Sequence, residues 1–189
     1  MKKTEYTNAD GVVANEPIDE KKLARAKKIL LELQEELKTC IKGGSGPFLA
    51  AIYDQKGNLI AKAANSVVSK QCSHNHAEMN TIREAEKKLN TYDLSAYSLS
   101  LYTTSEPCIM CMGGIMWSGI KEVYYGVPSP VVEKITDFDE GFKTHWLEEF
   151  RSRGISVYGN IEADVGAKIM QDYVDTKHIV YKPQRKAAK

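Results

Sequence analysis

Residues 99–126 read LSLYTTSEPCIMCMGGIMWSGIKEVYYG, and this stretch sets the architecture of the chain. Residues 99–104 predict a strand, residues 107–118 a helix opened by a proline, and residues 123–126 a second strand. Strands joined through a helix favour parallel pairing, because a parallel crossover needs about a dozen residues or more. The stretch therefore predicts a strand–helix–strand unit within a parallel part of a sheet.

The neighbouring segments extend this unit to a five-stranded sheet. Residues 48–53 and 59–64, joined by a turn, predict an antiparallel hairpin, and residues 155–158 predict the fifth strand. Apolar residues at steps of three and four predict further helices, from the capping residue Asp19 to Ile41, at 76–89, near 146–151 and at 163–173. We expect an α/β fold with a mixed sheet and helices on both faces.

Length and composition indicate one domain over residues 1–189. This length falls within the ~100–200 residues of a typical domain. The composition, 42% hydrophobic and 27% charged residues, is that of a globular protein and excludes a disordered chain. Residues 1–17 are expected to form an N-terminal extension, and the basic residues 182–189 a mobile tail. The stretch after the fourth strand, with Pro128 and Pro130, is expected to be irregular.

Charge and hydropathy argue against two classes of partner. Lys and Arg number 26 against 25 Asp and Glu, a net charge of +1, which disfavours nucleic acid. Residues 1–15 lack the apolar core of a signal peptide, and no apolar run approaches the ~20 residues that span a bilayer. We therefore expect a cytoplasmic protein without a membrane partner, whose four cysteines are thiols or metal ligands rather than disulfides. Cys40, on the first helix, is expected in the core.

Two short motifs stand at the starts of two predicted helices. One is His76-Ala77-Glu78, and the other is the Pro107-to-Cys111 stretch, which contains Cys108. The unpaired amides of a helix N-terminus favour thiolate over thiol. One imidazole and two thiolates supply three ligands for one Zn²⁺ and leave a fourth tetrahedral position for water or hydroxide. Glu78 would stand beside that water as the acid–base group without binding the metal.

Each motif alone has other interpretations. A Cys-x-x-Cys pair also suits redox chemistry or a closed structural zinc site, with Cys72 or His74 as the fourth ligand. A structural site, however, gives no role to Glu78. The combination, in this order, is the signature of zinc-dependent deaminases. A zinc-stabilised interaction protein without activity remains the alternative from another class, and ammonia release would distinguish the two.

The chain resembles the cytidine deaminase-like superfamily, and within it the bacterial guanine deaminase branch, over residues 46–181. Beyond the zinc motif, the resemblance rests on Gly46-Pro-Phe48, Asn65, Ser105-Glu-Pro-Cys108, Ile115-Met-Trp117 and Phe138-Asp-Glu-Gly141. It implies a three-layer α/β/α sandwich. It also implies a homodimer. The helix that carries Met110, Met112 and Met116 could supply the dimer interface, or these methionines could pack in the core of the domain.

The same resemblance implies the site residues and the substrate. Phe48 would wall the pocket, the Asn65 amide would bond the purine edge, and Ala77 and Trp117 would contact the substrate. Glu140, rather than its acidic neighbours, would be a second proton carrier. The implied reaction is hydrolytic deamination of a free nucleobase, guanine to xanthine and ammonia.

Other substrates stay open at this point. Residues 146–157 are also similar to cytosine deaminases, and a nucleoside or an aminated triazine could enter such a pocket. The tRNA adenosine deaminases share the sequence from Glu106 to Cys111. They typically carry Gly- and Ala-rich sequence where this chain has Val127-Pro-Ser-Pro130. The nearly neutral charge also argues against RNA, whose binding depends on phosphate neutralisation.

Overall fold

The structure, a computed structural model, describes residues 6–8 and 11–182. The expected mobile tail lies outside the described residues except for Lys182, as does part of the N-terminal extension. Among the described helices, none is both long and apolar enough to cross a membrane. The strands are β1 (Tyr6–Thr7), β2 (Val13–Ala14), β3 (Leu49–Tyr53), β4 (Leu59–Ala64), β5 (Ser100–Ser105), β6 (Glu122–Val127) and β7 (Ser156–Gly159). The α-helices are α1 (Glu20–Lys42), α2 (Val67–Lys70), α3 (Ala77–Leu89), α4 (Ile109–Ser118), α5 (Ser129–Thr136), α6 (Trp146–Ser152) and α7 (Ala163–Asp175).

All described strands form one mixed sheet in the order β1-β2-β7-β6-β5-β3-β4. The five predicted strands are present, with β5, β6 and β7 parallel and the β3–β4 hairpin antiparallel. The predicted number of strands was too small, because β1 and β2 add an antiparallel hairpin beyond β7. Two-residue strands show no alternation in sequence. Buried Asn15 secures this edge, donating to Ile155 O and accepting from Val157 N.

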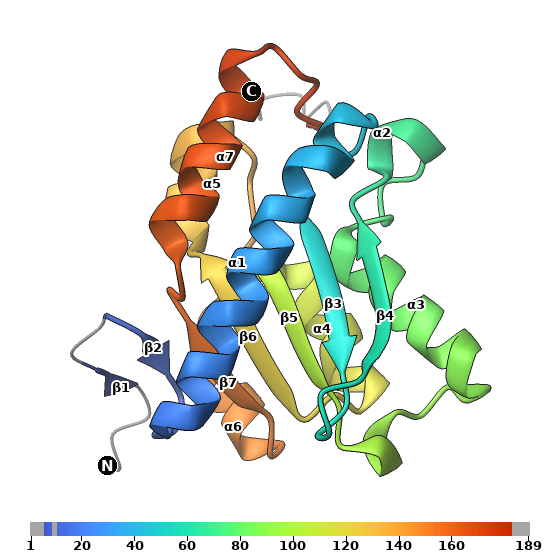
Figure 1. Ribbon diagram of the computed structural model, residues 1–189, viewed down its shortest axis with the longest axis vertical. Helices are drawn as coiled ribbons and strands as arrows, with labels where there is room; N and C mark the ends of the chain where they lie inside the picture. Colours follow the sequence, from blue (N-terminus) through green and yellow to red (C-terminus); the bar gives the residue numbers. More distant parts are fainter. Residues whose placement is uncertain (1–5, 9–10, 183–189) are drawn as a thin grey trace, which may run out of the picture.

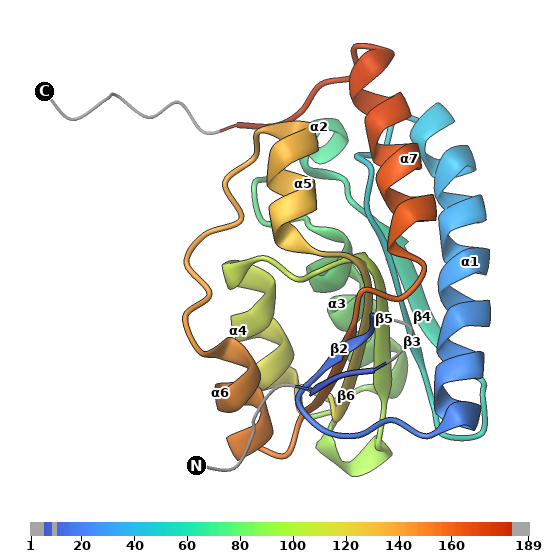
Figure 2. The ribbon, with the colours of Figure 1, turned by 90° about the vertical axis from the view of Figure 1, so that its left-hand side faces the viewer.

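The sheet lies between two layers of helices (Figure 1). α1 and α7 cover one face and α3, α4 and α6 the other, as the edge-on view in Figure 2 shows. The buried strand β3 supplies both layers: Leu49 and Ala51 pack with α1, whereas Ala50 and Ile52 pack with α3. The expected three-layer sandwich is therefore confirmed.

The irregular stretch expected around the two prolines is instead the helix α5. Pro128 is its N-cap and Pro130 lies in the first turn. Backbone N–H groups in the first turn have no acceptor within the helix, so a proline there loses no hydrogen bond. The carboxylate of Glu106 accepts a hydrogen bond from Ser129 N at 2.9 Å. The prolines thus begin a helix, and α5 packs against α7.

Candidate active site

Three ligand atoms meet where α3 and α4 begin. His76 is the N-cap of α3, Cys108 is the N-cap of α4, and Cys111 lies one turn into α4. Nδ1 of His76 is 3.4 Å from Sγ of Cys108 and 3.7 Å from Sγ of Cys111, and the two sulfur atoms are 3.6 Å apart. Tetrahedral zinc, with bonds of about 2.3 Å to sulfur and 2.0–2.1 Å to nitrogen, requires separations of about 3.5–3.8 Å. The donor set fits zinc.

The two possible fourth ligands lie elsewhere. Sγ of Cys72 is 3.3 Å from Nε2 of His74, and both residues belong to the loop before α3. Among the described residues, the group of ligand atoms within 4.8 Å of one another contains only His76, Cys108 and Cys111. The arrangement is therefore a three-ligand site rather than a closed structural one. Cys40, near the end of α1, is half-buried and packs against the edge of the core rather than within it.

The two thiols differ in acidity. The hydrogen bond between the sulfur atoms, aided by nearby His76, lowers the pKa of Cys108 to about 4 despite burial. The same contact, together with burial and the carboxylate of Glu78, raises the pKa of Cys111. For His76, burial acts to lower the pKa, but the hydrogen bond with Cys108 and the nearby negative groups raise it overall. A cysteine poised as thiolate suits a zinc ligand.

Glu78 lies in the first turn of α3, beside the ligand atoms. Its carboxylate accepts hydrogen bonds from Oγ1 of Thr103 at 3.0 Å and from Sγ of Cys111 at 3.5 Å. The residue is only 5% exposed, and burial raises its pKa. A carboxylate whose pKa is raised toward neutrality can both accept and return a proton.

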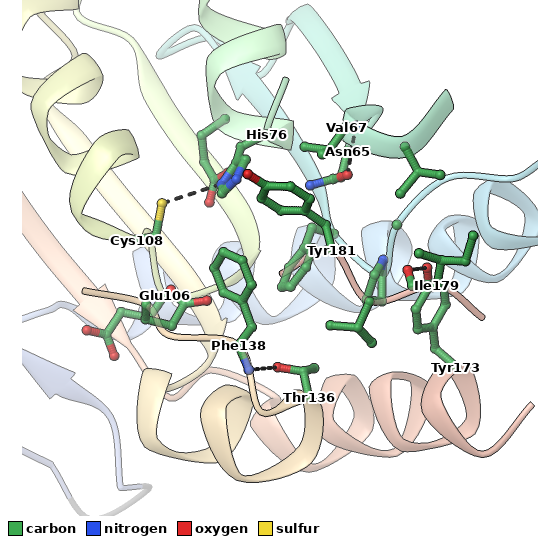
Figure 3. Close-up of a pocket in the computed structure, with 17 residues that line it drawn as sticks. Asn65, Val67, His76, Glu106, Cys108, Thr136, Phe138, Tyr173, Ile179 and Tyr181 are labelled. Atoms are coloured by element: carbon green, nitrogen blue, oxygen red, sulfur yellow. Dashed lines mark hydrogen bonds between the residues drawn. The ribbon is translucent and has the colours of Figure 1, made fainter. Parts of the chain in front are cut away.

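A pocket opens over the ligand atoms, and Figure 3 shows its lining. Two aromatic side chains lie next to His76: the Phe138 ring is 6.2 Å from the imidazole and 6.2 Å from the ring of Tyr181. Tyr181 reaches between His76 and Asn65 (Figure 3). Flat rings around a confined space favour a planar ligand.

The side chain of Asn65 lines the pocket, and the oxygen of its amide already accepts a hydrogen bond. Its Oδ1 accepts a hydrogen bond from Val67 N at 3.2 Å, which leaves the Nδ2 group to face a ligand. Gly46 crosses directly over this side chain, and a Cβ at that position would lie 2.8 Å from Oδ1 of Asn65. The Gly46-Pro-Phe48 motif therefore both makes room for Asn65 and supplies Phe48 to the pocket wall.

Glu140 also lines the pocket, whereas its neighbours Asp137 and Asp139 are exposed. Its side chain is 4% exposed. Burial raises the pKa of this carboxyl to about 8, although the nearby ammonium of Lys143 acts in the opposite direction.

Two residues expected to contact substrate are not among those lining the pocket. Ala77 is buried, and its carbonyl accepts a hydrogen bond from Thr81 Oγ1 at 2.7 Å. Trp117 is 84% exposed near the end of α4. The structure thus brings together the three ligands, Glu78, Phe48, Asn65 and Glu140, but not these two.

The sequence analysis missed the C-terminal wall of the pocket. After α7 the chain crosses back past α5 and α2 (Figure 2), and Ile179, Val180 and Tyr181 line the pocket. The hydroxyl of Tyr173 donates a hydrogen bond to Ile179 O at 2.7 Å and holds this segment. Phe138 also lines the pocket, although its motif did not predict this role. Its place two positions before the candidate catalytic acid Glu140 is the sequence signal that indicates a pocket residue.

Residues 23–127 match the family described as the cytidine and deoxycytidylate deaminase zinc-binding region. The chain belongs to this deaminase family. The match spans the three ligands and Glu78, so the donor cluster is a zinc site typical of the family.

Several members of the deaminase family are similar to this chain. The guanine deaminase of Bacillus subtilis is 38% identical over 100 residues, 53% of this chain and 62% of that protein. A probable cytosine deaminase of Schizosaccharomyces pombe is 32% identical over 114 residues, 59% of this chain and 67% of that protein. A tRNA-specific adenosine deaminase of Aquifex aeolicus is 40% identical over 90 residues, 48% of this chain and 58% of that protein. The chain therefore spans about three fifths of the length of these relatives.

Among solved structures, the Nitrosomonas europaea protein NE0047 in complex with 2,6-diaminopurine superposes with a TM-score of 0.78. It is 32% identical and covers 83% of this chain and 85% of its own. This likeness covers more of the chain than the matches to the three relatives named above.

Proposed function

We propose that the protein is a zinc-dependent deaminase of a free nucleobase, and that its substrate is guanine, converted with water to xanthine and ammonia. The observation that carries the proposal is the conjunction, in one pocket, of a three-ligand metal site with Glu78, Asn65 and Glu140. The likeness to NE0047, a family member solved with a diaminopurine, supports a purine base over a pyrimidine.

In this proposal each side chain handles one part of the reaction. Zinc held by His76, Cys108 and Cys111 would lower the pKa of a water molecule from about 15.7 to about 7, so that hydroxide is available at neutral pH. Glu78 accepts a proton from the attacking water and passes it to a ring nitrogen beside the amino-bearing carbon. Glu140 begins protonated and gives its proton to the amino group, which leaves as ammonia when the C–N bond breaks. Glu78 takes the hydroxyl proton of the attacked carbon as the carbonyl forms, and solvent returns that proton to Glu140. The free Nδ2 group of Asn65 donates to an acceptor on the edge of the base, and Phe48, Phe138 and Tyr181 hold its plane.

The pocket wall made by Ile179, Val180 and Tyr181 favours a free base over a nucleotide in RNA. A ribose and its flanking phosphates would have to pass this segment. The net charge of +1 also provides little phosphate neutralisation. The tRNA-specific adenosine deaminase of Aquifex aeolicus is similar to this chain over 48% of the chain's length at 40% identity, so tRNA stays in the panel of substrates below.

Ammonia release from purified, zinc-loaded protein tests the proposal. The panel contains guanine, adenine, cytosine, guanosine, an aminated triazine and tRNA. We expect guanine to be turned over fastest. Turnover of cytosine or tRNA with none of guanine would replace the proposed substrate, and no ammonia from any member would support the non-catalytic alternative.

We propose further that two copies associate through the surface of α4. Trp117 is 84% exposed on a helix whose Met112 and Ile115 are buried in the core. Exposed tryptophan is enriched in protein interfaces. Light scattering should give a dimer mass for the wild type and a monomer mass for Trp117→Ser. A monomer in the wild type at micromolar concentration would refute the dimer.

A further inference from the structure

A lysine lies behind the acidic groups of the pocket. The side chain of Lys143 is 11% exposed, in the segment between α5 and α6. Its Nζ is 3.4 Å from Oε1 of Glu106 and 3.4 Å from Oε2 of Glu140, and it also donates a hydrogen bond to Oγ of Ser129. Both carboxylates are less exposed than the lysine itself. An ammonium has three N–H donors, and here three oxygen atoms receive them.

The position of Lys143 separates it from the substrate. Glu106 and Glu140 line the pocket over the metal ligands, but Lys143 does not. Lys143 instead lines a neighbouring cavity of about 400 Å³, together with Tyr125 and Trp146. Glu106 lines both cavities, so the ammonium meets the carboxylates from the neighbouring cavity rather than from the base pocket.

The backbone of Glu140 is held independently of this contact. Its N–H donates to Oε1 of Glu133 at 3.1 Å, and its carbonyl accepts from Ile109 N at 3.1 Å. The main chain is thus tied to α5 and α4, while the ammonium of Lys143 contacts the carboxylate. With Oε2 held by the ammonium, Oε1 is the oxygen left for a ligand.

We propose that Lys143 is a positioning residue that aims the carboxylate of Glu140 into the base pocket. A buried carboxylate without a partner would turn toward water or take up a proton permanently. The ammonium holds Oε2 and so favours one rotamer, which leaves Oε1 to take up and release a proton. This inference rests on the proposed function, because it gives Glu140 its role through that reaction.

A double-mutant cycle on zinc-loaded protein tests the inference. Lys143→Met should lower kcat by about 10-fold or more with KM changed by less than about 3-fold, because misplacing a reacting group slows chemistry more than it weakens binding. In the Glu140→Gln background, Lys143→Met should lower kcat by less than about 3-fold, because the carboxylate that Lys143 positions is no longer there. Zinc content should stay unchanged. Equal losses in both backgrounds, or no loss in either, would overturn the inference.

Two further variants separate positioning from folding. Lys134→Met removes an exposed lysine from α5 and should leave kcat unchanged. Lys143→Ala opens space next to the neighbouring cavity, so added ethylammonium or propylammonium should restore part of kcat, and should have no effect on Glu140→Gln. Failure of every alkylammonium to raise the kcat of Lys143→Ala would count against an electrostatic role.

A third measurement does not need turnover. If the wild type releases no ammonia from any base, the proposed function fails, but the Lys143–Glu140 contact is still testable by thermal unfolding. Introduced into the wild type, Lys143→Met should lower the melting temperature at least twice as much as when it is introduced into Glu140→Gln. In the wild-type background the substitution leaves the buried carboxylate of Glu140 without its partner, whereas in Glu140→Gln that carboxylate is absent. Equal shifts would show that Lys143 does not support Glu140.

Discussion

The hydroxyl of Thr103 donates a hydrogen bond of 3.0 Å to Oε1 of Glu78. Thr103 lies in β5 and Glu78 in the first turn of α3, so a strand of the central sheet fixes the carboxylate that the proposed reaction uses most. The other oxygen faces Cys111 at 3.5 Å. Contacts from β5 on one oxygen and from α4 on the other hold the carboxylate of Glu78 in one orientation.

Glu78→Ala should retain fold and zinc but lose turnover by about 10²–10⁴-fold, the usual contribution of general acid–base catalysis. Thr103→Val should lose less, because it disturbs only the orientation of the carboxylate. Ammonia release, circular dichroism and metal analysis on the same preparations check both. A Glu78→Ala enzyme with nearly normal turnover would remove Glu78 from the mechanism.

Cys108→Ala should lose most of its zinc and all measurable activity, because two remaining ligands do not hold the ion tightly. Treatment of the wild type with a chelator should have the same effect and should lower the melting temperature, since a ligand bound only by the folded state stabilises it. Cys40→Ala, at a thiol away from the site, is the matched control and should keep one zinc per chain. Full zinc in Cys108→Ala would contradict the assignment.

Gly46→Ala should act through Asn65. The added Cβ would lie 2.8 Å from Oδ1 and 3.0 Å from Cγ of Asn65, so the amide must move. We expect KM for the base to rise by about 10-fold, the effect of about one lost hydrogen bond of 1.4 kcal/mol. Asn65→Ala should raise KM similarly, and the double variant should be little worse than either single one. Independent, multiplicative effects would show that Gly46 does not act through Asn65.

Glu140→Gln keeps the shape of the side chain but cannot carry a proton. Turnover of the best substrate should fall by about 10²-fold or more, with zinc content unchanged. Asp139→Asn, at an exposed acid one position earlier, is the control and should leave turnover unaltered. If Glu140→Gln matches the wild type, the carboxylate serves only structure.

An ion pair far from the site should make stability depend on pH. Burial acts to raise the pKa of Glu122, but hydrogen bonds from Lys22 and Ser100 outweigh it and lower the pKa overall. A carboxyl with a lowered pKa stabilises the fold above its unfolded pKa, and this stabilisation is lost as pH falls through the folded value. Glu122→Gln should therefore cost about 1 kcal/mol at pH 7 and progressively less in acid. Urea unfolding checks this, with Glu32→Gln, at an exposed pair, as the control. A difference that persists in acid would exclude the carboxylate as its origin.

The order and type of the main elements could be predicted because their signals are local. The apolar repeat of α1, the hairpin turn before β4 and the alternation of helices with β5, β6 and β7 each occupy a short window. The strands β1 and β2 could not be predicted, because their pairing depends on Asn15 contacting residues more than a hundred positions away. α5 was missed because proline is a helix breaker inside a helix but acceptable in its first turn.

The metal ligands could be predicted from sequence spacing alone. His76 and Glu78 lie two positions apart and Cys108 and Cys111 one helical turn apart, so local geometry alone puts each pair at a helix start. The walls of the pocket, in contrast, come from residues that are far apart in the sequence and meet only in the folded chain. Tyr181 reaches His76 across 105 positions of sequence, and Lys143 reaches Glu106 across 37. Trp117, two positions after buried Ile115 on the same helix, is exposed and does not line the pocket. Such placements depend on how helices pack on the sheet, and no spacing along the chain encodes that packing locally.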